Sequence, residues 1–324
     1  MPGASDAELK RTSQALACLT AAHDASLLLA VSGGPDSMAM LDLVQRAWQG
    51  PLQAATVDHG LRAESADEAR MVADFCAARD ILHATLRPQE PISGSLQAAA
   101  RAARYALLQS HAARIGADHV VTAHHADDQL ETILMRLARG AGVDGLAAVR
   151  ARNGCVIRPM LGFRKAELVR YCTAKSIPFV ADPSNANSDF DRVRMRQALA
   201  TFDAVDPLMA VRSATALAEA AEALDWVAGR EAARTMVRDL DGVRLAMVDY
   251  PPGLLRRLVL VALRQVDLDI SVRGPALDRL LVRLQQGEQA MIGNILCMPA
   301  AAGQGWLFRP APPRSGAFSR IASE

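Results

Sequence analysis

Cysteine is scarce in this sequence, with five residues among 324, at positions 18, 76, 155, 172 and 297. Their number is odd and no two stand two or three residues apart, which argues against both a disulfide framework and a zinc site. A run of 18 apolar residues is also lacking, and residues 1–14 have no basic stretch followed by an apolar core. These absences predict a cytoplasmic protein with reduced thiols, no secretion signal and no membrane contact.

An excess of charge of one sign is absent too, because 36 basic side chains face 35 acidic ones and the formal net charge is +1. Lysine supplies only three of the basic residues, and arginine supplies the other 33. Codon usage explains such a bias over a whole chain, and a preference for bidentate phosphate binding is the second explanation. With 51% hydrophobic residues the chain is not disordered, and its length suggests two domains of roughly 100 to 200 residues each.

Short apolar runs alternate with helical patterns through the first 140 residues. The first run, at 27–31 (LLLAV), ends before two glycines and precedes a helical pattern over 37–48. Further strands are expected at 52–57, 83–87 and 119–123, and further helices near 63–79, 96–115 and 127–138. This alternation predicts an α/β fold with a parallel sheet and helices on both of its faces. Ligands of such sheets bind beyond the carboxyl ends of the strands.

The alternation stops near residue 203. Long helices rich in Ala, Leu and Arg are expected at 211–240 and 254–266, and the sequence from 291 onward suggests a small hairpin and a Pro-rich end. We therefore expect an α/β domain over residues 1–203 and a smaller, mostly helical domain with a short terminal hairpin over residues 204–324.

The segment between the first strand and its helix reads SGGPDS, residues 32–37. Two glycines let the backbone turn tightly, so that successive N–H groups and the helix N-terminus can point at one anion. The segment lacks the Gly-Lys-Ser/Thr of a P-loop and the third glycine of a dinucleotide site. Asp36 would repel a phosphate there unless a cation such as Mg²⁺ bridged the two. The alternative is an ordinary Gly-Pro turn with an acid at the start of a helix.

A second polar cluster follows the strand expected at 119–123. On a helix starting near residue 126, Asp127 and Glu131 lie four residues apart on one face, with Asp128 on the adjacent one, and two histidines precede them. Three interpretations stay open at this point. The cluster could face a nucleotide, it could cap the helix through acids in its first turn, or it could bind zinc.

The loop at residues 32–37 resembles the signature of the ATP pyrophosphatases, the PP-loop or N-type family. The resemblance implies an enzyme that splits ATP between the α and β phosphates, adenylylates an oxygen of its substrate and releases pyrophosphate. It also implies that the loop residues bind ATP, with Mg²⁺ on Asp36. The implied ATP-binding residues are Ser32, Gly33, Gly34, Pro35, Asp36, Ser37 and, from the second cluster, His124.

Further segments resemble one branch of that family, the tRNA(Ile)-lysidine synthetases. They are VDHGLR at 57–62, ARAARY at 100–105, TAHHADDQLET at 122–132, RGAG at 139–142, and DPSN at 182–185 followed by DRVRMR at 191–196. Their order over residues 32–196 makes the resemblance specific, and it weakens after residue 205. Val193 departs from the pattern, because the last motif usually carries Asn at that position.

The resemblance implies a two-step reaction on the first anticodon cytidine of a tRNA(Ile) with a CAU anticodon. ATP and Mg²⁺ would activate the C2 oxygen as an adenylate, and the ε-amine of free L-lysine would then displace AMP. Codon reading would change from AUG to AUA. The implied catalytic residues are Asp36, Asp127, Asp128, Glu131 and Arg101. The sequence does not rank the acids as the base, and Arg101 and Arg104, three apart on a helix, could also be a solvated face.

A local basic segment is the candidate tRNA surface. Residues 136–170 carry eight basic side chains against Asp144 and Glu167, a local charge of +6, and a patch of this size suffices for phosphate contacts. The eight are Arg136, Arg139, Arg150, Arg152, Arg158, Arg164, Lys165 and Arg170. From this segment and the one after it, the tRNA-binding candidates are Arg139, Arg150, Arg152, Arg192, Arg194 and Arg196. A solvated, salt-bridged surface is the alternative, and the C-terminal domain is expected to add shape recognition of the tRNA.

Three other functions compete with this reading. A tRNA thiolase of the same superfamily would need a thiol pair or cluster ligands, and the cysteines are isolated. An amide-forming ligase would need an ammonia source. A non-catalytic ATP-binding module would account for the loop but not for the acidic cluster.

Overall fold

The computed structural model describes residues 4–58, 60, 65–88, 96–180, 191–202, 204–272, 274–300 and 305–312. The chain divides into two compact units, Met1–Ala218 and Glu219–Glu324, and the division falls inside the long helix α9 (Pro207–Thr235). Among the described residues, no helix is long and apolar enough to cross a membrane.

The first unit is built on a six-stranded sheet of order β3-β2-β1-β4-β6-β5. Its strands are β1 (Leu27–Ala30), β2 (Leu52–Val57), β3 (Leu82–Leu86), β4 (His119–Val121), β5 (Arg152–Asn153) and β6 (Val156–Ile157). All described pairs are parallel except β5 with β6. The expected parallel sheet is therefore confirmed, and its register places the carboxyl ends of β1 and β4 side by side.

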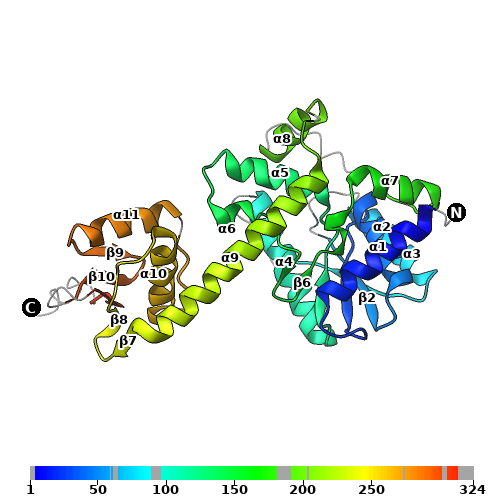
Figure 1. The fold of residues 1–324 in the computed structure, drawn as a ribbon. Coiled ribbons are helices and arrows are strands. Elements are labelled where there is room, and N and C mark those ends of the chain that lie inside the picture. Colours follow the sequence, from blue (N-terminus) through cyan, green and yellow to red (C-terminus); the bar gives the residue numbers. More distant parts are fainter. Residues whose placement is uncertain are drawn as a thin grey trace, which may run out of the picture. The chain divides into compact units, whose positions relative to one another are not determined.

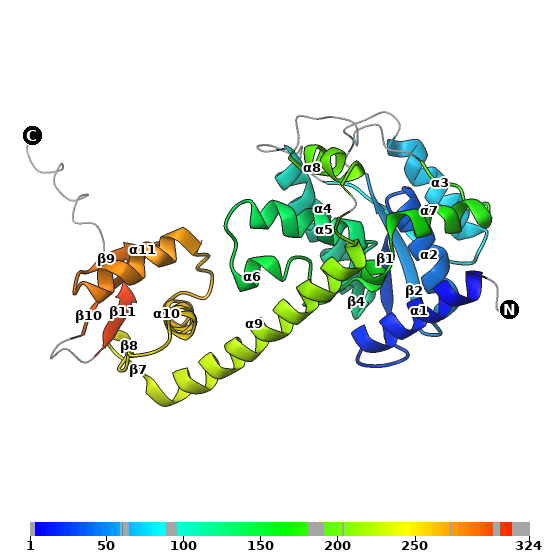
Figure 2. The ribbon, with the colours of Figure 1, turned by 45° about the horizontal axis from the view of Figure 1, so that its top comes forward.

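Helices cover both faces of this sheet (Figures 1 and 2). Leu27 and Leu29 of β1 point into a core shared with one set of helices, and Leu28 points into a separate core with α4. The first set is α1 (Ala4–Leu19), α2 (Pro35–Ala47), α3 (Ser65–Ala77) and α7 (Lys165–Ala174), opposite α4 (Leu96–Ile115). Because every residue of β1 is covered, the strand reads as a continuous apolar run rather than an alternating one.

The remaining helices of the first unit follow the central strands. They are α5 (Ala126–Leu137), α6 (Val143–Leu146), the 3₁₀ helix η1 (Pro159–Gly162) and α8 (Asp191–Ala200). Helix α5 starts directly after β4, and the N–H of its first residue, Ala126, donates to the carbonyl of Phe163 at 2.8 Å. This bond ties the start of α5 to the segment that enters α7.

The second unit holds an antiparallel sheet of order β7-β8-β11-β10-β9. Its elements after α9 are β7 (Met236–Asp239), β8 (Gly242–Leu245), α10 (Pro252–Val266), α11 (Gly274–Gln285), β9 (Ala290–Ile292), β10 (Ile295–Pro299) and β11 (Trp306–Pro310). The expected terminal hairpin is part of this sheet. The helix expected over 211–240 ends at Thr235, because residues 236–245 form a hairpin around the Asp-Gly pair at 241–242.

Gly305 tests how strictly this second sheet constrains its backbone. Its φ is +83°, and a Cβ there would lie 1.9 Å from the carbonyl oxygen of Leu245 on β8. We expect Gly305→Ala to lower the free energy of unfolding by about 2 kcal/mol or more, from left-handed strain and displacement of the strand. Urea unfolding measures the loss, and hydrogen exchange localises it to residues 236–310.

Gly253→Ala is the matched control, because a Cβ at Gly253 meets no atom within 4 Å. Equal stability of the two variants would contradict the prediction.

Candidate active site

The loop after β1 is shaped by its own side chains. Gly33 has φ +84°, a conformation that favours glycine, and Pro35 opens α2, where its missing N–H costs nothing. The Ser37 hydroxyl accepts from the Ser32 N–H at 3.1 Å and donates to the Gly34 carbonyl at 2.9 Å. The first helical hydrogen bond of α2 runs from the Met38 N–H to the Gly34 carbonyl. The N–H groups that precede it in the first turn have no partner within the helix, so they can bind an anion.

The same loop is tied to the end of the α/β unit. The N–H of Val180 donates to the Gly33 carbonyl at 3.0 Å, and the Cys172 thiol of α7 donates to the Pro35 carbonyl at 3.3 Å. The buried Cys172 therefore has a structural role, and burial raises its pKa to about 12. Both contacts hold the loop in place through residues that come much later in the chain.

Asp36 places a carboxylate at the N-terminus of α2. Its Oδ1 is buried without a partner among the described residues, and its Oδ2 lies 3.5 Å from His125 Nε2. Mg²⁺ prefers carboxylate oxygens and completes its coordination with substrate phosphates and water. The unpaired Oδ1 of Asp36, beside the glycine loop at residues 32–37, therefore fits this ion. No group of three His, Cys, Asp or Glu side chains arranged for a metal occurs in the described part of the chain.

His125 joins the loop to the acidic helix. Its Nε2 lies 3.5 Å from Asp36 Oδ2 and 3.4 Å from Asp128 Oδ2, and its Nδ1 lies 3.5 Å from Asp127 Oδ2. Burial lowers the pKa of His125, but the hydrogen bonds with Asp127 and Asp36 and the charge of Asp128 outweigh burial and raise it to about 10. The imidazole is therefore a buried cation that holds three carboxylates together.

The charge of His125 also decides how α5 is capped. A neutral Nδ1 can accept from the Asp128 N–H at 3.3 Å, whereas a charged imidazolium donates from both nitrogens. In the charged state the cap is the other half of the capping box, in which Asp128 Oδ2 accepts from the His125 N–H at 3.2 Å. The helix cap, one of the three predicted alternatives, is therefore present, while a role of the same acids toward a nucleotide stays a prediction.

Asp127 is fixed from the opposite side by α7. Its Oδ2 accepts from the Lys165 N–H at 2.7 Å, at the N-terminus of that helix. Burial raises the pKa of Asp127, but the hydrogen bonds from His125 and Lys165 lower it to about 2. Asp127 is therefore ionised at neutral pH, and its Oδ1 forms an ion pair with the guanidinium of Arg164 at 3.9 Å.

Helix α8 neutralises the remaining acids. Arg192 binds Asp128 Oδ1 at 2.9 Å and Glu131 Oε2 at 2.8 Å, and Arg196 binds Glu131 through both carboxylate oxygens at 2.7 and 3.2 Å. Burial raises the pKa of Glu131, but the hydrogen bonds from the two arginines lower it. Arg192 and Arg196, predicted to contact tRNA, therefore hold the acidic cluster. Val193 between them is buried.

His124 has a different environment from its neighbour. Its Nδ1 lies 3.0 Å from the Thr122 hydroxyl, and burial together with the charges of Arg158 and Arg101 holds its pKa well below the usual range. His124 is neutral, so it can accept or donate a hydrogen bond to a nucleotide without adding charge. Arg101 is exposed on α4 near these residues.

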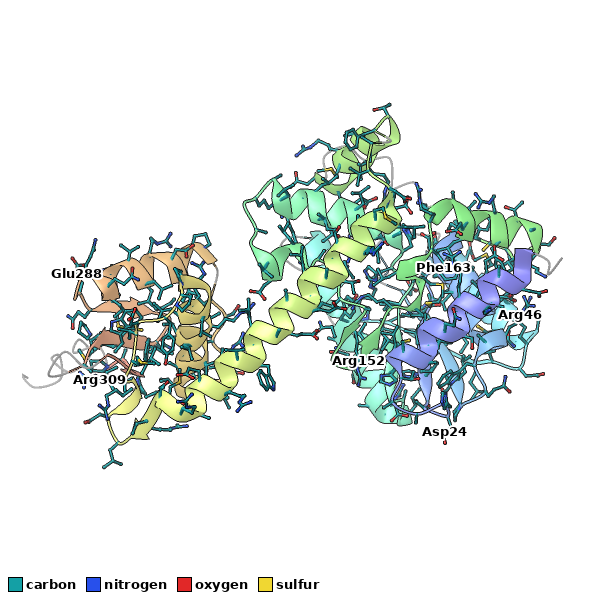
Figure 3. The ribbon with its side chains drawn as sticks, viewed as in Figure 1. Asp24, Arg46, Arg152, Phe163, Glu288 and Arg309 are labelled. Carbon is teal, nitrogen blue, oxygen red and sulfur yellow. The ribbon has the colours of Figure 1, made fainter. Side chains whose placement is uncertain are left out.

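The other tRNA candidates lie on the surface. Arg139 and Arg194 are exposed and both pair with Asp191, Arg139 at 2.9 Å. Arg150 donates to the Ala218 carbonyl at 3.2 Å, and Arg152 is exposed. The charge of Arg152 acts on His119 at the start of β4, and Figure 3 places Arg152 lower than Phe163, toward Asp24.

Two residues of this site were missing from the predicted set of functional residues. His125 follows His124 in the same motif. Its position directly before helix α5 is the feature of the sequence that points to it. Arg158 belongs to the basic segment at 136–170, but only the structure shows that it is buried. The motif at 182–185 and residues 59 and 61–62 lie outside the described residues.

Comparison with known proteins identifies the family model and the relatives that this chain matches. A family model described as the PP-loop domain matches residues 7–202. A tRNA(Ile)-lysidine synthase of Zymomonas mobilis is 38% identical, with 89% of each chain covered, and one of Novosphingobium aromaticivorans is 42% identical, with 88% of each covered. Among solved structures, the U34-tRNA thiolase NcsA of Methanococcus maripaludis, which holds a [4Fe-4S] cluster, superposes with a TM-score of 0.55 at 17% identity, covering 66% of this chain and 80% of that one. The last likeness is one of fold.

His125→Leu tests the buried cation. Without the imidazolium, Asp36, Asp127 and Asp128 lose their shared positive partner, so we expect the free energy of unfolding to fall by about 3 kcal/mol in the presence of EDTA. Urea denaturation at neutral pH measures it.

His83→Leu is the matched control. His83 is half-buried, its pKa is lowered by burial, and it makes one neutral contact with Thr56 at 2.9 Å, so its loss should cost about 1 kcal/mol. The same loss in both variants would show that the charge of His125 is not what stabilises the cluster.

Proposed function

Because the chain belongs to the PP-loop family, in its tRNA(Ile)-lysidine synthase branch, we propose that it joins free L-lysine to C2 of the first anticodon cytidine of a CAU-anticodon tRNA(Ile). It is an ATP-dependent ligase of tRNA modification. The observation that carries the finer proposal is the convergence of Asp36, Asp127 and Asp128 on His125 beside the phosphate loop. The products would be AMP, pyrophosphate and a tRNA that reads AUA.

The first step forms an adenylate. The cytidine C2 oxygen attacks the α-phosphorus of ATP, and pyrophosphate leaves with the electron pair of the α–β bridge. The N–H groups at the start of α2 are suited to hold the phosphates, and the Ser37 hydroxyl, which donates to the Gly34 carbonyl, shapes the loop that presents them. Asp36 is suited to hold Mg²⁺, which would neutralise the leaving pyrophosphate. Neutral His124 is suited to contact the nucleotide, and Arg101 the developing negative charge.

The second step needs a neutral amine, although the lysine side chain has a pKa near 10.4 in water. The nitrogen attacks C2, the bond from C2 to the adenylate oxygen breaks, and AMP departs. We assign the binding of the ammonium group to Asp127, because its Oδ1 accepts no hydrogen bond from the described residues and lies 3.9 Å from Arg164, whereas the unpartnered Oδ1 of Asp36 is assigned to the metal. The proton then passes to a carboxylate of the cluster. Asp127, Asp128 and Glu131 stay candidates, because both oxygens of Glu131 accept from arginines and both oxygens of Asp128 accept from Arg192 and the His125 N–H.

The thiol chemistry of the rival thiolase lacks support. All five cysteines are unpaired, and burial raises the pKa of Cys76 to about 11 and that of Cys297 to about 12, which makes both poor nucleophiles. Only Cys18 is exposed, on α1. The lysine amine supplied as a substrate therefore fits this site better than a protein thiolate.

Asp36→Asn tests the reaction. We expect incorporation of radiolabelled lysine into a CAU-anticodon tRNA(Ile) transcript, dependent on ATP and Mg²⁺, to fall at least a hundredfold, because the neutral amide no longer holds the metal charge. Asp67→Asn, which loses an exposed carboxylate on α3, should keep full activity.

The wild-type result separates the competing functions. Pyrophosphate release without label in the RNA would contradict lysine as the nucleophile, and release at the wild-type rate by Asp36→Asn would remove Asp36 from the metal role. Absence of both pyrophosphate and label with any tRNA would favour the non-catalytic ATP-binding module.

A tRNA surface around Asp191 is proposed from Arg139 and Arg194, with Arg150 and Arg152 as further candidates. The double change Arg139→Gln and Arg194→Gln should weaken tRNA binding about tenfold and reduce its salt slope by about one unit per arginine, with ATP binding unchanged. Filter binding from 50 to 200 mM salt measures both. Arg70→Gln, an exposed arginine of α3, is the control, and an unchanged slope would place the RNA elsewhere.

A further inference from the structure

Several arginines gather near the carboxyl ends of β4 and β6, around Tyr105 and His124. The guanidinium carbons of Arg101 and Arg104 on α4 lie 5.2 and 5.5 Å from the centre of the Tyr105 ring. Arg158 follows β6 directly, and its charge acts on both Tyr105 and His124. Three cations from two separate segments therefore surround one tyrosine.

These cations lack the carboxylates that neutralise the arginines of α8. Within the described ranges, Arg101, Arg104 and Arg158 form no ion pair, whereas Arg192 and Arg196 are each bound to acids. Arg158 is only 6% exposed; its Nη1 donates to the Arg150 carbonyl at 2.7 Å, but its Nε has no partner. The Tyr105 hydroxyl is buried without a partner as well.

An arrangement of this kind costs stability unless an anion completes it. A buried charge needs a partner of opposite sign, and like charges held close together repel. Burial and the charge of Arg101 lower the pKa of Arg104. Burial raises the pKa of Tyr105, but the charges of Arg101, Arg158 and Arg104 outweigh it and lower that pKa. The cluster therefore stabilises negative charge placed beside it.

The position of the cluster separates it from the phosphate loop. The loop follows β1, while His124 and Arg158 follow β4 and β6, which are the next two strands of the sheet. At about 4.8 Å per strand, the cluster lies roughly 5 to 10 Å along the sheet edge from the loop. That separation suits a second phosphate group rather than the pyrophosphate held at α2.

We propose that Arg101, Arg104 and Arg158, with the Tyr105 hydroxyl, form a second anion site that takes a phosphate ester. The chemistry of the ligand follows from the three guanidinium groups and the phenol donor. Its source depends on the proposed function: it is either the α-phosphate that the nucleotide carries into the adenylate or a backbone phosphate of the RNA.

Inorganic phosphate is the first probe, because it needs no catalysis. Phosphate should stabilise the wild-type protein against thermal unfolding more than sodium chloride at equal ionic strength does. Arg158→Gln should weaken the apparent phosphate affinity about tenfold, as expected for losing a charged hydrogen-bond donor. Arg114→Gln, an exposed arginine in the last turn of α4, should leave it unchanged.

Arg101→Gln keeps the test decisive if Arg158→Gln fails to fold, because Arg101 is exposed. Equal phosphate affinity in wild type, Arg101→Gln and folded Arg158→Gln would overturn the site. A loss of lysine incorporation alone would bear on the proposed function and leave the phosphate result standing.

Two binding measurements then identify the source of the ester. Weaker binding of Mg²⁺-ATP by the variants, with tRNA binding unchanged, assigns the site to the nucleotide. Weaker tRNA binding with ATP binding unchanged assigns it to the RNA backbone. Unchanged affinity for both ligands contradicts the proposal.

Discussion

The buried imidazolium of His125 is the interaction on which the rest of the site depends. Asp36 lies in the first turn of α2, and Asp127 and Asp128 lie in the first turn of α5. Without a cation between them these carboxylates would repel one another in a partly buried place. The parallel register of β1 and β4 brings both helix starts to one edge of the sheet, and His125 then makes their proximity stable. The loop at residues 32–37 and the acidic start of α5 thereby lie together at that edge.

The charged side chains of the first unit differ in whether they have partners of opposite charge. The carboxylates of α5 are held by His125 and by Arg192 and Arg196 of α8, so they stay ionised and fixed in place. The arginines beside Tyr105 have no such partners within the described residues. Under the proposed function, a substrate that brings a lysine ammonium and a phosphate ester would find a group of opposite charge for each.

The parts of the fold that could be predicted from sequence are those with local signals. Strands β1 and β2 and helix α4 were expected at nearly their observed bounds, because each is an apolar run or helical pattern ended by glycine or polar residues. Strands β5 and β6 have two residues each and leave no periodicity to detect. Strand β7 follows α9 directly, with no proline or glycine to mark the change, and only the Asp-Gly pair after it indicated a hairpin.

The site residues that could be predicted are likewise those close together in the chain, and those whose partners are far away in the chain could not. The loop at 32–37 and the acids at 127, 128 and 131 could be found because each group is contiguous or lies within one helical turn. The role of Arg192 could not, since its partners Asp128 and Glu131 lie more than 60 residues earlier in the chain. Counting charge along a sequence adds the residues of a segment but says nothing of their partners. An arginine-rich segment therefore looks the same whether its arginines face RNA or neutralise buried acids, and only the fold separates Arg194 at the surface from Arg196 inside the cluster.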